Sequence, residues 1–418
     1  YMKLLENRNA QAIHDGYENY AEDCYDMYDR DYTAKDIQRV YQSVRETAVP
    51  LRERLIQELY GQDDVNEAFD YTVSGEEEIW DTVEGVVSQI DETLAESMRH
   101  MRKLHLYDNA FSDDKMDVGF TSPLPYYGDA YIFNSPYGYY QDIMDMMHEF
   151  GHYNGFMQNE VSSLLSLSVL DVEEIKSQGL ELLSLGYADE LYGEYAKTLS
   201  MVQLYNILSA VIDGCLFDEF QYEIYTHPGM TLQEINALYA SISEEYGDPL
   251  SEDEQMEWVY NSHTFQSPMY YISYATSGLS AIDIFTMAAK DRDKATQTYL
   301  KVASLPCDTL YQDALEECGL HNIFVPGVVE TILDEETLFQ ALDNVGNGGQ
   351  RIGEDKESEP KEEKPQDGAS ESAKEGESGK EKAKQEEVAG SGQTATGEAD
   401  AFAPYREFLQ AFTLQRGL

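Results

Sequence analysis

The chain has 418 residues, of which 80 are acidic and 28 are basic, and its formal net charge at pH 7 is −52. Nucleic acids and anionic membrane surfaces would repel such a chain, so both are excluded as partners. Hydrophobic residues make up 42% and aromatic residues 12%, which is enough for a large core, and because no run of about 18 apolar residues occurs we expect no membrane span.

Residues 1 to about 106 show helical periodicity with long charged stretches, and we expect a set of long helices there. Thr33 and Asp36 have the spacing of a capping box that begins one of these helices. Between residues 107 and 140 the sequence becomes rich in Gly, Pro, Asn and Asp, and the run DAYIF at 129–133 predicts a short strand. We expect this strand to offer a free edge along which an extended peptide lies.

The ten residues 143–152 read IMDMMHEFGH. Their apolar residues fall at i, i+3, i+4 and i+7, which predicts one buried stripe of a helix. His148 and His152 then emerge from one face, a turn apart, and can converge on one cation, with Glu149 beside them. Zinc peptidases use this geometry, in which the glutamate takes a proton from the water at the metal. The alternative is a core helix that carries two structural histidines.

Catalytic zinc sites normally have three protein ligands, so a third ligand must lie elsewhere in the chain. The metzincin pattern would need a histidine six residues after His152, but that position is Gln158. A thermolysin-like arrangement would use the dipeptide Asn159–Glu160, which stands too close to His152 to begin a second helix. Neither pattern therefore supplies the third ligand.

Glu174 is the third candidate, because it lies 22 residues beyond His152 on a helical segment of its own. Glu174 and Glu181 share one face of that segment, so Glu174 can be aimed at the first helix while Glu181 hydrogen-bonds a ligand histidine. Glu173 and Asp171 are close competitors, and a solvated acidic helix face is the alternative reading of all these carboxylates.

Helical patterns dominate from residue 141 to about 345, where the sequence NVGNGGQ ends the periodicity. We therefore expect one helical catalytic body over residues 1–349. Residues 350–401 form an acidic low-complexity segment, with 15 acidic and 7 basic side chains between 354 and 400, and we expect it to be disordered. Residues 402–418 recover apolar spacing and predict a short amphipathic segment.

HEFGH, followed after this interval by EIKSQGLE, resembles the thimet oligopeptidase and oligoendopeptidase F family of zinc metallopeptidases. In that family the glutamate that opens an E-x-x-S-Q/M-x-x-E segment is the third zinc ligand, and the matching position here is Glu174. Upstream, GYENYAEDCYDMYDRDYTAKD is similar to the family's G-Y-x-N-Y and R-D-Y-T segments, so the resemblance spans roughly residues 10 to 345. It implies a mainly α, zincin-like fold of two lobes, with a small β element beside the active-site helix and a deep channel that admits short unfolded peptides.

The segment HTFQSPMYYISYATSGLSA, residues 263–281, resembles the family's histidine followed by a Y-x-x-x-Y-A-T-G stretch. The resemblance implies that His263, Tyr270 and Tyr274 contact the substrate and stabilise the tetrahedral intermediate. Tyr271 can replace Tyr270 in this role, because the spacing from His263 is looser than in the family. Without the family, these tyrosines are read as core aromatics.

Three features depart from the family pattern. Gly155 stands where relatives commonly have a further histidine after HEFGH. Full-length relatives carry an additional amino-terminal region that has no counterpart in this sequence, so we expect one lobe to be truncated. The acidic segment after Gly349 is not a family feature.

The residues and the resemblance together predict a zinc-dependent endopeptidase that hydrolyses short unstructured peptides. One Zn²⁺ per chain is held by His148, His152 and Glu174, and Glu149 is the general base. Two alternatives are a catalytically silent peptide-binding protein on the same scaffold and an acidic helical interaction protein whose histidines are structural. The resemblance implies a cytoplasmic location, while the sequence leaves an exported form and the oligomeric state open.

Overall fold

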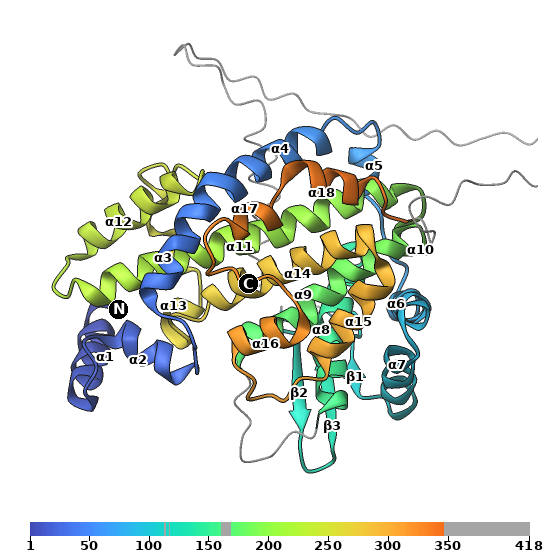
Figure 1. The fold of residues 1–418 in the computed structure, drawn as a ribbon, viewed down its shortest axis with the longest axis horizontal. Helices are drawn as coiled ribbons and strands as arrows, with labels where there is room; N and C mark the ends of the chain where they lie inside the picture. Colours follow the sequence, from blue (N-terminus) through green and yellow to red (C-terminus); the bar gives the residue numbers. More distant parts are fainter. Residues whose placement is uncertain (113, 117, 160–168, 347–418) are drawn as a thin grey trace, which may run out of the picture.

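The computed structural model describes residues 1–112, 114–116, 118–159 and 169–346. These residues are mainly helical with one small three-stranded sheet, which confirms the predicted fold class (Figure 1). The predicted end of the body at residue 349, the acidic segment 350–401 and the amphipathic segment 402–418 all lie outside the described residues.

In the sequence, the three strands of the sheet stand between two groups of helices. The helices before it are α1 (Met2–Asp15), α2 (Tyr20–Met27), α3 (Ala34–Ser43), α4 (Val49–Leu59), α5 (Val65–Phe69), α6 (Glu76–Ile90) and α7 (Glu92–Leu104). The strands are β1 (Tyr107–Asp108), β2 (Phe120–Leu124) and β3 (Asp129–Phe133). The helices after it are α8 (Gln141–Gln158), α9 (Leu170–Ser184), α10 (Ala188–Tyr192), α11 (Ala196–Thr226), α12 (Leu232–Glu245), α13 (His263–Gln266), α14 (Ile272–Lys290), α15 (Arg292–Ala303), α16 (Tyr311–Cys318), α17 (Val328–Ile332) and α18 (Glu335–Leu342).

The amino-terminal helices follow the predicted pattern. Thr33 accepts a hydrogen bond from the backbone of Asp36, and the Asp36 carboxylate accepts one from the backbone of Thr33, so the predicted capping box begins α3. A π-helical turn, Val44–Ala48, joins α3 to α4. Pro50, the second residue after this turn, lacks the N–H that an uninterrupted α-helix would use, which accounts for the widened turn at this place. The resulting long element packs along α11.

The sheet corrects one expectation from the sequence. Its strand order is β1-β3-β2, so β3, the predicted DAYIF strand, is central: β2 pairs with it along its whole length, and β1 pairs with Ile132 and Phe133 on its other side. β1 pairs with it in parallel and β2 pairs with it antiparallel. The prediction of a free edge was wrong on the β2 side, because it missed this strand, which precedes β3 and is joined to it by the turn at residues 125–128. Among the described residues, no strand pairs with the outer side of β2, so that side is the available edge.

The core is built around α9, which packs against both α8 and α14, while α14 packs in turn against α11 (Figure 1). Gly151 makes the α8–α9 contact possible. A Cβ atom at this position would lie 2.5 Å from the carbonyl oxygen of Lys176 and 2.7 Å from the Cα of Ser177, distances that folded proteins do not tolerate. The two backbones therefore touch at Gly151, one residue before His152 and about half a turn beyond Glu174 on the facing helix.

Helix α11 is buried on most of its circumference. Of 31 residues in α11, only a few are not buried, which is the pattern of a helix surrounded by protein. The stretch Leu170–Thr226 contains one helical window long and apolar enough to cross a membrane, but 94% of that window is buried inside the fold. Its apolar character is therefore accounted for by packing within the molecule.

Replacing Gly151 tests the importance of this backbone contact. We expect Gly151→Ala to lower the free energy of unfolding by about 1–3 kcal/mol, because the added methyl group must push α8 away from α9. Gly85→Ala is the matched control: Gly85 also lies inside a helix, α6, but a Cβ there meets nothing within 4 Å, and we expect a gain of up to about 1 kcal/mol. Denaturant unfolding of both variants provides the measurement. Equal effects of the two substitutions would contradict this account of the α8–α9 contact.

Candidate metal centre

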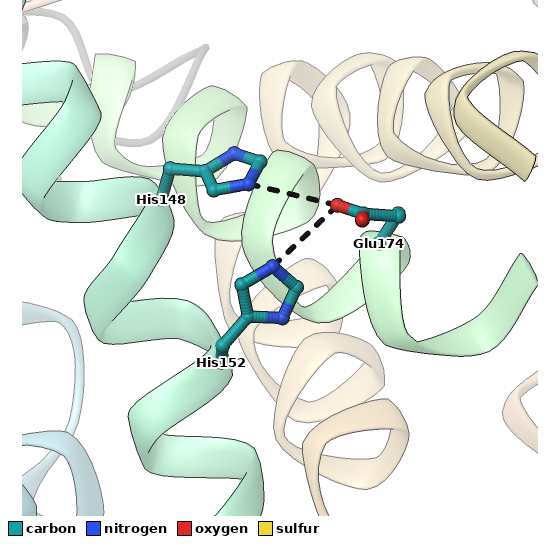
Figure 2. A group of neighbouring side chains, drawn as sticks. All are labelled: His148, His152 and Glu174. Atoms are coloured by element: carbon teal, nitrogen blue, oxygen red, sulfur yellow. Dashed lines mark ion pairs between the residues drawn. The ribbon is translucent and has the colours of Figure 1, made fainter. Parts of the chain in front are cut away.

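The two histidines of HEFGH lie one turn apart on α8, with their ring centroids 5.0 Å from each other. Glu174 faces them from α9, and its Oε2 atom lies 3.5 Å from the Nε2 atom of His148 and 3.5 Å from that of His152. Figure 2 shows both imidazoles turned toward the same carboxylate oxygen. All three potential ligand atoms lie within 4.8 Å of one another, so the predicted trio is brought together.

The spacing of these atoms suits a tetrahedral metal ion. Zn²⁺ lies about 2.0–2.1 Å from nitrogen and oxygen ligands, so two ligands of one tetrahedral ion are separated by about 3.4 Å. The two nitrogen–oxygen distances of 3.5 Å match this value. Two imidazoles and one carboxylate are also a donor set that zinc accepts in catalytic sites. The residues present therefore fit a zinc ion without any rearrangement of the backbone.

Glu181 contacts the ring nitrogen of His148 that does not face Glu174. Its Oε1 atom lies 2.6 Å from the Nδ1 atom of His148, so this ring nitrogen is occupied and Nε2 is left facing Glu174. The side-chain amide of Gln203, on α11, donates to the other oxygen of Glu181. Ser177 donates to Glu174 Oε2 over 3.0 Å. Neither Gln203 nor Ser177 was predicted as a site residue. Ser177 bonds within α9, and Gln203 reaches α9 from the distant helix α11, and the spacing of residues in the sequence indicates neither contact.

Charge interactions hold His148 and Glu174 in opposite ionisation states. Burial by itself would lower the pKa of His148, but the hydrogen bond to Glu181 and the charges of Glu181 and Glu174 outweigh burial and raise the pKa to about 9. Burial would raise the pKa of Glu174, yet the imidazoles of His152 and His148 and the Ser177 hydroxyl lower it to about 2. The buried carboxylate is therefore ionised at neutral pH and available as a ligand.

The two competitors of Glu174 are engaged elsewhere. Glu173 forms a buried ion pair with Lys176, with 2.6 Å between Oε1 and Nζ. Asp171 accepts hydrogen bonds from the hydroxyl groups of Tyr32 and Thr276. Because both carboxylates are held by these partners, and only Glu174 of the three acids is grouped with the two histidines, the packing partners decide which acid is the candidate ligand.

Lys176 also explains the departure at Gly155. A Cβ atom on Gly155 would lie 2.6 Å from the Cδ atom of Lys176. The aliphatic part of Lys176 thus occupies the space beside α8 that a side chain at position 155 would need. A histidine at this position, as in the family pattern, would require Lys176 to move.

Glu149 lies on the sheet side of α8. Its Oε2 atom accepts a hydrogen bond of 2.7 Å from the hydroxyl of Thr121 on β2, and the same hydroxyl lies 2.9 Å from its backbone oxygen. Gly119, just before β2, also approaches this side chain, since a Cβ there would lie 3.1 Å from Glu149 Oε1. Thr121 was not predicted as a site residue, because β2 itself was not predicted. The strand therefore places a hydrogen-bond donor against the proposed base.

The downstream motif meets the metal ligands through Tyr270. Its hydroxyl donates to Glu174 Oε1 over 3.0 Å. The ring of His263 lies 5.0 Å from that of Tyr270 and 6.4 Å from that of Tyr274. The ring of Tyr271 also lies 5.2 Å from that of His263 and packs against Phe217 at 5.0 Å, but Tyr271 makes no hydrogen bond to Glu174 among those described. The geometry therefore favours Tyr270 over Tyr271 as the phenol beside the ligands.

Burial keeps these side chains neutral. It raises the pKa of Tyr270 well above its usual range, an effect that the charge of Glu174 reinforces. Burial acts in the same direction on the pKa of Tyr274, and it lowers the pKa of His263. Each phenol is thus a neutral hydrogen-bond donor at physiological pH.

Comparisons with known proteins identify the fold. No protein-family model and no curated protein sequence matches the chain. Solved structures do match: an oligoendopeptidase F (TM-score 0.74, 22% identity), a PZ peptidase A with an inhibitor (0.73, 21%) and an oligoendopeptidase F from Bacillus anthracis (0.70, 20%). Each match covers 84% of this chain, which spans 65%, 66% and 64% of the three matched chains, respectively. The chain therefore has the fold of the oligoendopeptidase F structures, which is the fold that its motifs predicted.

Proposed function

We propose that this chain is a zinc-dependent endopeptidase that hydrolyses short unstructured peptides. The observation that carries the proposal is the meeting of His148, His152 and Glu174 at distances that suit one tetrahedral ion. The likeness to solved peptidase structures supports it, as does the glutamate that follows the first histidine. The substrate channel that the family resemblance implies remains a prediction.

A zinc ion held by these three residues would polarise both a water molecule and the carbonyl group of the bond to be cleaved. Glu149 is the base in this scheme: it accepts a proton from the attacking water and delivers it to the departing amine. The hydrogen bond from Thr121 orients the Glu149 carboxylate for that role. Glu181 keeps the Nδ1 side of His148 occupied, which leaves its Nε2 atom free as a ligand.

The negative charge that develops on the carbonyl oxygen needs neutral donors nearby. We assign this role to Tyr270, because its hydroxyl lies beside Glu174 and can turn from that carboxylate to a substrate oxygen. His263 and Tyr274 pack around the Tyr270 ring and complete this side of the site. The outer edge of β2 provides a row of backbone groups near Glu149 along which a peptide can lie in extended form.

The metal ligands can be tested without any substrate. We expect the purified chain to retain about one zinc per molecule after dialysis, as catalytic sites of this type do. His152→Ala should lose this metal, whereas His227→Ala, which alters an exposed histidine on the surface, should keep it. Glu181→Gln should weaken zinc binding about 10- to 100-fold, because the orientation of His148 is lost. Elemental analysis and competition with a chelator provide the measurements. Full zinc retention by His152→Ala would refute the assignment.

Glu149→Gln separates catalysis from metal binding. The amide cannot accept the proton of the water, so we expect kcat for a fluorogenic peptide to fall about 10²- to 10⁴-fold while the zinc content stays at the wild-type level. A catalytically silent peptide-binding protein would instead show peptide binding and no turnover in either form. Wild-type turnover that survives the substitution unchanged would rule out Glu149 as the base.

Tyr270→Phe tests the oxyanion donor, and Tyr271→Phe is its control at the adjacent position. Loss of one such donor typically costs about 10²- to 10³-fold in kcat, and we expect an effect of this size for Tyr270→Phe with little change in KM. Tyr271 lies against Phe217, so its hydroxyl should matter far less. The assignment fails if the two variants have reversed effects in a steady-state peptide assay.

A further inference from the structure

Met269, the residue before Tyr270, has an unusual backbone conformation. Its φ angle is +63°, in the left-handed region, and its side chain is completely buried. Among the described residues, the other non-glycine positions with positive φ are Asp29 and His105, which are exposed and follow the ends of helices α2 and α7. For a residue that carries a Cβ atom, the left-handed region is about 5- to 30-fold less populated than the right-handed region. The conformation of Met269 must therefore be maintained by its surroundings.

Two side chains hold the Met269 backbone from opposite sides. Its N–H donates to the Oε1 atom of Gln221, on α11, over 2.6 Å. Its carbonyl oxygen accepts a hydrogen bond of 2.5 Å from Nη2 of Arg30. Gln221 is 1% exposed and the Arg30 side chain is fully buried, so water does not compete for either bond. Both backbone groups of this one residue are thus fixed by distant parts of the chain.

Arg30 also contacts the helix that carries the third ligand. Its Nε atom lies 3.6 Å from Oδ2 of Asp171, which is three residues before Glu174 on α9. Its guanidinium stands over the ring of Tyr28, 5.1 Å from the centroid, and Tyr28 meets the ring of Tyr270 edge to face at 6.4 Å. One guanidinium therefore connects the segment before Tyr270 with the first turn of the helix that bears Glu174.

We propose that Arg30 and Gln221 are positioning residues for the oxyanion donor: by holding Met269 in the left-handed conformation they fix the Tyr270 hydroxyl beside Glu174. The proposal rests on the proposed peptidase function. Among the described residues, neither side chain hydrogen-bonds Glu174 or the histidines, and the Met269 backbone is the contact that the two share. When one hydrogen bond is lost, the intrinsic preference of Met269 draws it toward negative φ, and the direction in which the next side chain leaves the backbone changes with it.

A double-mutant cycle tests this route. Gln221→Met removes the acceptor at nearly constant volume, and we expect kcat to fall about 5- to 30-fold with KM and zinc content unchanged. Glycine adopts positive φ without penalty, so in a Met269→Gly background the same Gln221→Met change should lower kcat less than about threefold. An equal loss of kcat in both backgrounds would overturn the proposal, because Gln221 would then act by another route.

Arg30→Lys and Arg52→Lys form a matched pair for the second hydrogen bond. Both arginines are buried and paired with an aspartate, but Arg52 pairs with Asp248 and does not contact Met269. We expect both variants to lose stability and only Arg30→Lys to lose kcat, with a size similar to that of Gln221→Met. Equal kcat values for the two variants would count against the role of Arg30.

A structural readout keeps this test independent of the proposed function. In crystals of the metal-free Gln221→Met variant, we expect Met269 to leave the left-handed region and the Tyr270 hydroxyl to lie beyond hydrogen-bond distance of Glu174 Oε1. A wild-type chain without peptidase activity would refute the proposed function and leave this expectation in force. An unchanged Met269 φ and an unchanged Tyr270–Glu174 hydrogen bond would refute the positioning role itself.

Discussion

The close contact of α8 and α9 at Gly151 is the constraint on which the site depends. Two helices with ordinary side chains at their crossing stand 8–10 Å apart, whereas here a Cβ would already lie 2.5 Å from the opposite backbone. The short separation allows one carboxylate, that of Glu174, to reach two imidazoles on the neighbouring helix. A wider crossing would leave His148 and His152 without their third partner.

A buried carboxylate facing two imidazoles is stable only if every charge has a partner. Glu174 has the two histidines, Ser177 and Tyr270, and His148 has Glu181 behind it. Two further elements complete the cluster. Thr121 of β2 hydrogen-bonds Glu149, and the segment before α14 carries Tyr270, whose hydroxyl donates to Glu174. The cluster is thus assembled from four separate parts of the chain, and its geometry follows from their packing.

The sequence predicted the parts of this site that local spacing controls. The four-residue interval between His148 and His152 determines their common face, and the resemblance selected Glu174. The rest depends on contacts between residues far apart in the chain. The free edge was assigned to β3 because nothing in the residues before it indicated that β2 would cover that edge. Gln203 was missed for a similar reason, since its hydrogen bond to Glu181 joins helices that only the folded core brings together.

The most direct test of the central claim is a crystal structure of the zinc-loaded chain with anomalous diffraction measured at the zinc edge. The account predicts one strong peak per chain, about 2.0–2.2 Å from Nε2 of His148, Nε2 of His152 and an oxygen of Glu174. A loaded chain whose zinc lies elsewhere, or whose Glu174 carboxylate turns away from the ion, would contradict it.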